Sequence, residues 1–167
     1  MTAPPRIIGT LRLGADGRGV VRVEDLYDTS PGDLWSALTE PARLARWVAV
    51  VSGDLCLGGT FQAQFTSGWT GPGRVDVCDP PQRLLLTMTP GQPDTTVIEA
   101  VLTPEGDGTR LVVEERGLPV AELPGYGAGW QAHLEDLARH VGERDDVAWN
   151  ARWTELTPLY RLRGLSE

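Results

Sequence analysis

Hydrophobic residues are concentrated in two runs at the start of the chain. Residues 7–13 and 19–27 are apolar, β-rich runs, and Asp16-Gly17 lies between them. An Asp-Gly pair favours the tight two-residue turn of a β-hairpin. The pattern therefore predicts that the chain begins with a hairpin.

Between residues 53 and 116 the apolar positions follow a period of two. Phe61, Ala63 and Phe65 alternate with polar residues, which places their side chains on one face of a strand. Gly71-Pro72-Gly73 has the composition of a turn. Because short turns join the runs, we expect an antiparallel meander of five or six strands. The expected strands are residues 54–57, 61–65, 74–78, 83–89, 95–103 and 109–116.

Two short helices are expected between the hairpin and the meander. Ser30 can cap the first helix, and Pro31 suits its first position. Pro41 begins a second helix, in which Leu44 and Trp47 recur at helical spacing. The proline between them makes this a bent helix pair.

The strongest helical signal covers about residues 124–142. At 100° per residue, five apolar side chains fall within an arc of about 80°. Gly142 ends the pattern. A stripe of this kind must be buried, and the curved sheet is its obvious partner, so we expect the helix to close over the sheet. The five residues are Tyr126, Trp130, Leu134, Leu137 and Val141.

Residues 143–167 form an extension beyond that helix. Asp145-Asp146 can cap a last short helix, which carries Trp149 and Trp153 four residues apart until Pro158 breaks the pattern. These two tryptophans need a partner surface. The extension can pack on the flank of the 1–142 domain, or against a second subunit in a homodimer.

Composition narrows the classes of partner. The 167 residues carry a formal net charge of −8. Nucleic-acid binding and attraction to anionic lipid surfaces both need a basic face, so neither is expected. The N-terminus lacks the apolar segment of a signal peptide, and no run of 18 apolar residues exists, so we expect a cytoplasmic protein without membrane insertion. Cys56 and Cys78 are expected to be reduced, mostly buried thiols.

Four segments, in this order, resemble one known family. Residues 35–47 resemble the helix pair of START-like proteins, and residues 53–61 resemble the strand and glycine turn that follow it. Residues 106–115 resemble the last hairpin of these proteins, and residues 125–134 the start of their closing helix. The chain is therefore similar, over about residues 20–142, to the START-like (SRPBCC) superfamily and to its branch of activator of Hsp90 ATPase homologues.

This resemblance implies a particular fold and a range of functions. The implied fold is the α+β helix-grip (Bet v 1-like) architecture over residues 1–142, with a hydrophobic cavity between the sheet and the closing helix. Relatives carry lipids, cyclise polyketides or act as co-chaperones. Because one fold hosts many activities, the resemblance implies the fold and its cavity more firmly than the ligand or the activity.

Large apolar side chains are the candidates for the cavity wall. Aromatic residues at core spacing are more often plain core, so packing is the alternative for each of them. Met88 suits an adaptable pocket wall and ordinary packing equally well. The candidate ligand-binding residues are Trp35, Trp47, Phe61, Phe65, Trp69, Met88, Trp130, His133 and Leu137.

His133 is the most informative polar candidate. It lies about 20° from Tyr126 on the helical wheel, at the edge of the apolar stripe. It can meet a ligand or act as an acid or base, or it can be a boundary histidine bonded to a strand or to water. In one strand only Glu114 or Glu115 can face inward. An inward Glu115 beside His133 would make an acid–base pair, whereas an outward glutamate would pair with arginines of neighbouring strands.

The chain shows no HExxH or CxxC pattern, so we expect no metal and no cofactor. Three functions remain. The first is non-catalytic binding of a small lipid- or polyketide-like ligand. The second is a cyclase- or dehydratase-type enzyme that uses His133 and an inward glutamate. The third is a protein-interaction module, for which a chaperone is a conceivable partner. A filled interior would exclude the first two.

Overall fold

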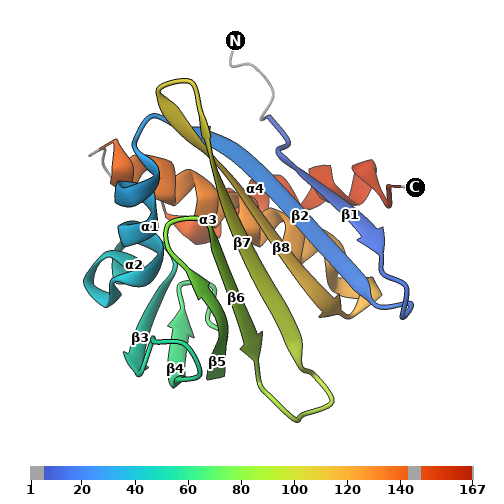
Figure 1. Cartoon of the computed structure of the whole chain (residues 1–167). Coiled ribbons are helices and arrows are strands. Elements are labelled where there is room, and N and C mark those ends of the chain that lie inside the picture. The colour runs from blue at the N-terminus through green and yellow to red at the C-terminus, as the bar shows by residue number, and fades with distance from the viewer. Residues whose placement is uncertain (1–5, 143–147, 167) are drawn as a thin grey trace.

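The expected helix-grip fold is confirmed by the computed structural model, which describes residues 6–142 and 148–166 (Figure 1). The strands are β1 (Gly9–Leu13), β2 (Gly19–Tyr27), β3 (Ala49–Gly53), β4 (Thr60–Phe65), β5 (Thr70–Asp79), β6 (Arg83–Met88), β7 (Thr96–Glu105) and β8 (Gly108–Leu118). The helices are α1 (Pro31–Thr39), α2 (Pro41–Trp47), a 3₁₀ turn η1 (Val120–Glu122), α3 (Leu123–Val141) and α4 (Trp149–Arg163).

All eight strands form one antiparallel sheet in the order β1-β2-β8-β7-β6-β5-β4-β3. The predicted opening hairpin pairs β1 with β2, and β2 then crosses to β8 at the other end of the meander. Figure 1 shows α3 and α4 on one side of this sheet. Alternation along the strands therefore sends one set of side chains toward the helices and the other toward solvent.

The bent helix pair is held by two local contacts. Ser30 caps α1 as expected, since its hydroxyl accepts a hydrogen bond from the backbone N–H of Asp33 at 3.2 Å. The indole N–H of Trp47 in α2 donates to the backbone carbonyl of Ala37 in α1 at 2.8 Å. Trp47 is buried, so this bond fixes one helix against the other.

The closing helix α3 packs on the β1–β2 edge of the sheet. The hydroxyl of Tyr27 at the end of β2 donates to the backbone carbonyl of Leu134 at 2.9 Å. Gly19 leaves room for the side chain of Leu123, because a Cβ at Gly19 would lie 2.5 Å from a Leu123 methyl carbon. This close approach at one edge leaves α3 standing away from the middle of the sheet.

The C-terminal helix α4 packs along α3 of the same chain. The indole N–H groups of Trp149 and Trp153 donate to the backbone carbonyls of Gly129 and Gly125, at 3.3 and 2.9 Å. The hydroxyl of Tyr160 is 2.7 Å from the side-chain oxygen of Gln131. Residues 143–147, including the expected cap, lie outside the described residues. Participation of the extension in a homodimer stays a prediction.

Two predicted interruptions of regular structure are wrong: the turn at residues 71–73 and the end of the last helix at Pro158. Gly71-Pro72-Gly73 lies inside β5, opposite residues 61–63 of β4. Glycine at 73 is required there because a Cβ would lie 2.3 Å from the ring of Phe61, which crosses it. Pro158 lies inside α4, which continues to Arg163 because buried Leu156 and Tyr160 hold the helix on both sides of the proline.

The expected strand at residues 54–57 is also wrong, because the strand is β3 and ends at Gly53. The Asp54 carboxylate accepts the backbone N–H of Cys56 at 2.9 Å, which favours a turn. Cys56 is consequently exposed, contrary to expectation, while Cys78 is half-buried and both thiols are free. Across the described ranges, no helix has the length and apolar character needed to span a membrane.

Candidate functional site

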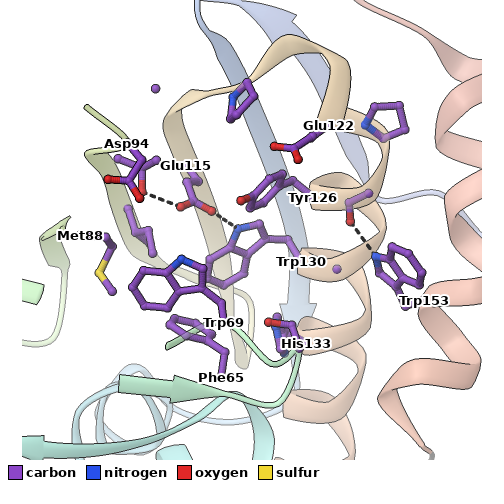
Figure 2. A pocket seen from close by; sticks show the side chains of 18 of the residues that line it. Phe65, Trp69, Met88, Asp94, Glu115, Glu122, Tyr126, Trp130, His133 and Trp153 are labelled. Atoms are coloured by element: carbon purple, nitrogen blue, oxygen red, sulfur yellow. Dashed lines mark hydrogen bonds between the residues drawn. The ribbon is translucent and has the colours of Figure 1, made fainter. Parts of the chain in front are cut away.

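A pocket of about 890 Å³ lies where α3 stands away from the sheet. Strands β6–β8, the β4–β5 turn and α3 form its walls, and α4 contributes residues around the start of α3 (Figure 2). The volume is within the range of small-molecule sites. Its buried residues include Met88, Ile98, Glu115, Trp130 and His133, and its exposed rim includes Arg18, Asp94, Ala121 and Glu122.

Aromatic rings form much of the buried wall. Phe65 at the end of β4 and Trp69 before β5 meet edge to face, with ring centroids 5.4 Å apart. Trp130 and His133 extend from successive turns of α3, with centroids 5.6 Å apart. Figure 2 shows Trp69 and Phe65 next to Trp130 and His133. This surface suits a flat or extended apolar molecule.

Glu115 brings a buried carboxyl group into this wall. It is 7% exposed. The indole N–H of Trp130 donates to one carboxylate oxygen at 2.9 Å, and the hydroxyl of Thr96 donates to the other at 2.8 Å. Burial raises the pKa of Glu115, and these two hydrogen bonds oppose the rise. Its hydrogen bonds within the described residues involve no basic side chain.

The neighbouring glutamate points the other way. Glu114 lies on the outer face of the sheet, where its carboxylate pairs with Arg12 at 3.1 Å and Arg116 at 3.0 Å. The alternation along β8 thus assigns one glutamate to an outer ion-pair network and Glu115 to the pocket. The sequence left this choice open.

His133 is 4% exposed and is surrounded by aromatic rings. Its ring is hydrogen-bonded to the backbone of Trp47, while Nδ1 has no hydrogen-bond partner among the described residues. Burial lowers the pKa of His133 to about 4, so the ring is neutral at physiological pH. A neutral imidazole bonded through its other nitrogen presents Nδ1 as a hydrogen-bond acceptor.

The rim is predominantly acidic around Tyr126. The carboxylates of Glu115, Glu122 and Asp94 add to burial in raising the pKa of the Tyr126 hydroxyl. The guanidinium of Arg18 donates to the backbone carbonyls of Pro93 and Gly117, at 3.3 and 3.5 Å.

The turn before β7 also borders the pocket. Thr89 has a φ of +47°, a conformation that β-branched residues rarely adopt. Its carbonyl accepts the hydroxyl of Thr95 at 2.7 Å, and its own hydroxyl donates to the carbonyl of Asp94 at 3.2 Å. These bonds hold the turn, and with it Asp94, at the pocket rim.

The structure separates the predicted site residues into two groups. Phe65, Trp69, Met88, Trp130, His133 and the acid–base candidate Glu115 all line the pocket. Trp35, Trp47, Phe61 and Leu137 belong to the core and are absent from its lining. Trp47 is engaged in the α1–α2 contact, Phe61 crosses Gly73, and Leu137 is fully buried. Glu115 and His133 share the pocket without a hydrogen bond between them.

Sequence reasoning missed several lining residues. Thr96 and Ile98 share the inner face because Ile98 pairs directly with Glu115 across β7 and β8. That position follows from period two once Glu115 is known to face inward. Trp149 and Trp153 line the pocket as well, and no local signal in the extension could place them there. The described residues contain no cluster of His, Cys, Asp and Glu that could hold a metal ion.

Comparison with known proteins gives a family and several similar structures. The sequence profile of the family described as Activator of Hsp90 ATPase homolog 1-like protein matches residues 28–142. No curated protein matches the sequence.

Similar solved structures include CalU16, DynU16 and a third protein that shares the fold. CalU16 from Micromonospora echinospora is 27% identical over 97% of this chain and 98% of its own, with a TM-score of 0.74. DynU16, from the dynemicin biosynthetic locus, is 28% identical over 74% of this chain, with a TM-score of 0.67, and this chain spans 47% of DynU16. A protein from Bordetella parapertussis, 23% identical over 100% of this chain and 97% of its own, shares the fold with a TM-score of 0.73.

Proposed function

Because the chain belongs to the activator of Hsp90 ATPase homolog 1-like family, whose fold binds small hydrophobic ligands, we propose that its pocket binds a small, largely apolar molecule. The observation that carries this proposal is the pocket of about 890 Å³ with its wall of aromatic rings beneath α3. Lipid-like and polyketide-like compounds are the ligand classes that suit its size and lining.

The pocket also favours this function over a protein-interaction module. A module of that kind has no need for an internal space, and well-packed cores contain few voids larger than a water molecule. The half-buried ring of Trp69 lines this space, so part of its surface has no packing partner. A bound apolar ligand would supply that partner.

The similar structures support a small-molecule ligand. DynU16 comes from a biosynthetic locus, and CalU16 aligns with this chain over almost its whole length. The α4 extension is therefore within the aligned part of CalU16, which supports its role as part of the pocket rather than as a separate appendage.

Acid–base catalysis is the second candidate, and one observation favours it. Glu115 is an inward carboxyl group whose pKa is raised by burial, and an upward shift is the direction that general-acid catalysis by a carboxyl group needs. A second group would have to act on the substrate, and His133 is the other titratable side chain of the buried wall. Turnover of a bound ligand that is lost in Glu115→Gln would favour this function.

Binding of the neutral fluorescent dye Nile red tests the proposal. The matched variants are Trp69→Ala, which removes a ring from the pocket, and Trp35→Ala, which removes an equally half-buried ring outside it. We expect saturable binding to the unmodified chain and weaker binding to Trp69→Ala by about tenfold, the loss of about 1.4 kcal/mol of apolar contact. Trp35→Ala should lower stability without changing the dye affinity.

Thermal unfolding of both variants controls for loss of the fold. Absence of saturable dye binding by the unmodified chain would contradict the proposal. If both substitutions weaken dye binding equally in variants that remain folded, the dye does not bind in the pocket, and this result would also contradict the proposal.

A further inference from the structure

We propose that the natural ligand carries an amino group on its apolar body and that Glu115 binds this group as an ammonium ion. The inference rests on the proposed function and specifies the chemistry of the ligand. It is carried by a buried carboxylate that lacks a cation and by a separate buried acceptor, Nδ1 of His133, that lacks a donor.

The first observation is the state of the Glu115 carboxylate. Each oxygen accepts one hydrogen bond, from Trp130 or from Thr96, and retains further acceptor capacity. Buried charges in proteins are normally paired, and this one lines a pocket instead of meeting an arginine. Glu99 on the adjacent strand β7, on the outer face, is paired with both Arg83 and Arg116. The missing cation is therefore specific to the pocket face.

The second observation is the aromatic surface around this carboxylate. Figure 2 shows Glu115 beside Tyr126 and next to the indole of Trp130, with Trp69 below them. Ammonium ions bind over the faces of aromatic rings within about 6 Å of the ring centre. A carboxylate flanked by such rings suits an amine with apolar substituents, because the rings contact the substituents and the charge together.

The rim has the same electrostatic preference. Asp94 and Glu122 face the Tyr126 end of the pocket and add negative charge to that of Glu115. The basic lining residues are Arg18 and Arg161. Arg18 is engaged with the carbonyls of Pro93 and Gly117, and Arg161 lies exposed on α4. The Tyr126 end of the pocket, where Asp94 and Glu122 lie near Glu115, therefore favours a cationic group.

His133 supplies independent support for a donor-bearing ligand. Its Nδ1 is buried, lacks a partner among the described residues and belongs to a ring that lines the same pocket. A buried acceptor without a donor carries an uncompensated cost of desolvation. The buried wall thus offers two acceptors, and the Trp130 indole and the Thr96 hydroxyl already donate to Glu115. An N–H or O–H group of the ligand would satisfy Nδ1.

Alternative head groups fit this arrangement less well. A carboxylate or phosphate would be repelled by the Glu115 carboxylate. A neutral hydroxyl group can bond to Glu115 but leaves its buried charge without a counterion, which is the costly element. The amine is the group that both bonds to the carboxylate and neutralises it.

Three probes that share one apolar body test this inference. Naphthylmethylamine, naphthylmethanol and naphthoic acid differ in their head group, and isothermal titration calorimetry measures their affinities for the full chain. We expect the amine to bind about tenfold or more tightly than the alcohol, because the ammonium ion pairs its charge with the Glu115 carboxylate and the alcohol is neutral. The acid should bind more weakly than both.

Two isosteric variants assign any such preference to a residue. Glu115→Gln keeps an amide oxygen for the Trp130 indole and removes the charge, so it should abolish the preference for the amine over the alcohol. Glu114→Gln removes the same charge one residue away on the outer face, and it should retain the preference.

The outcomes separate this inference from the proposed function. Binding of the alcohol as tightly as the amine, or an amine preference that survives in Glu115→Gln, overturns the inference while the binding function stands. Failure of all three probes and of Nile red to bind overturns both.

Discussion

The indole N–H of Trp130 donates a 2.9 Å hydrogen bond to the carboxylate of Glu115, which joins the closing helix α3 to strand β8 across the pocket. Both residues are buried, and both line the space in which we place the ligand. The bond thus holds α3 at a fixed distance from the middle of the sheet and orients the carboxylate at the same time.

Removing this donor should change both stability and the Glu115 titration. Trp130→Phe deletes the N–H group and leaves one carboxylate oxygen without its buried partner. We expect a loss of about 1–3 kcal/mol in the free energy of unfolding, measured with urea near neutral pH. The pKa of Glu115 should rise further, because the Trp130 bond lowers it in the native chain. Carboxyl-carbon NMR measures that titration.

A second tryptophan provides the control. Trp149→Phe also deletes a buried indole N–H, but this one is bonded to the backbone carbonyl of Gly129 at 3.3 Å. It should lower stability without moving the Glu115 titration. A pKa of Glu115 that is unchanged in Trp130→Phe would contradict the role assigned to this bond.

His133 should make the chain sensitive to mild acid. Its folded-state pKa of about 4 lies below the ordinary value of 6.5, so the unfolded chain binds a proton that the folded chain excludes. Its stabilising contribution is therefore fully present above pH 6.5 and is lost progressively as the pH falls toward about 4. The full loss is about 3 kcal/mol, since one unit corresponds to about 1.36 kcal/mol.

Comparison with His133→Gln isolates this contribution. The glutamine amide can still donate to the Trp47 backbone but does not titrate. Glu115, whose raised pKa gives a contribution of opposite sign that is lost as the pH rises, is present in both proteins and cancels in the difference. Urea unfolding from pH 7 to pH 4 should show the unmodified chain losing more stability. Parallel pH profiles for the two proteins would show that His133 is not held neutral by the fold.

Two glycines of α3 should respond differently to alanine. A Cβ at Gly127 would lie 2.7 Å from Tyr160 and 2.9 Å from Leu11, so Gly127→Ala forces α4 and β1 away from the helix. We expect a cost of about 1–3 kcal/mol. At Gly125 the nearest atom is 3.6 Å away, so Gly125→Ala should be neutral or stabilising by up to about 1 kcal/mol. Thermal unfolding of the two variants measures this difference, and equal stabilities of Gly127→Ala and Gly125→Ala would contradict the packing of α4 on α3.

The sheet and the closing helix were predictable because their apolar periods agree with their burial. Leu134 and Leu137, from the predicted stripe, are fully buried in the core. The continuation of β5 through residues 71–73 and of α4 through Pro158 was not predictable. Glycine at 73 makes room for the ring of Phe61, and the packing of α4 on α3 tolerates Pro158. Local composition indicates a turn at both positions, and only distant contacts override it.

The sequence also did not indicate which of the predicted site residues line the pocket and which pack in the core. Trp35 and Trp69 look alike in the sequence, and both are half-buried. Trp69 lines the pocket because it follows the β4–β5 turn beside Phe65, whereas Trp35 lies on α1. Which ring lines the pocket depends on where α3 stands away from the sheet. The Tyr27–Leu134 and Trp130–Glu115 hydrogen bonds join α3 to the sheet and together fix the separation between them.

The six tryptophans provide the most direct measurement of ligand binding in this pocket. Their indole N–H signals in a proton–nitrogen NMR spectrum report on separate sites, and naphthylmethylamine is the added probe. We predict saturable shifts for Trp69, Trp130, Trp149 and Trp153, which line the pocket, with Trp35 and Trp47 unmoved. Shifts confined to Trp35 and Trp47, or no saturable shift in any of the six, would contradict the account.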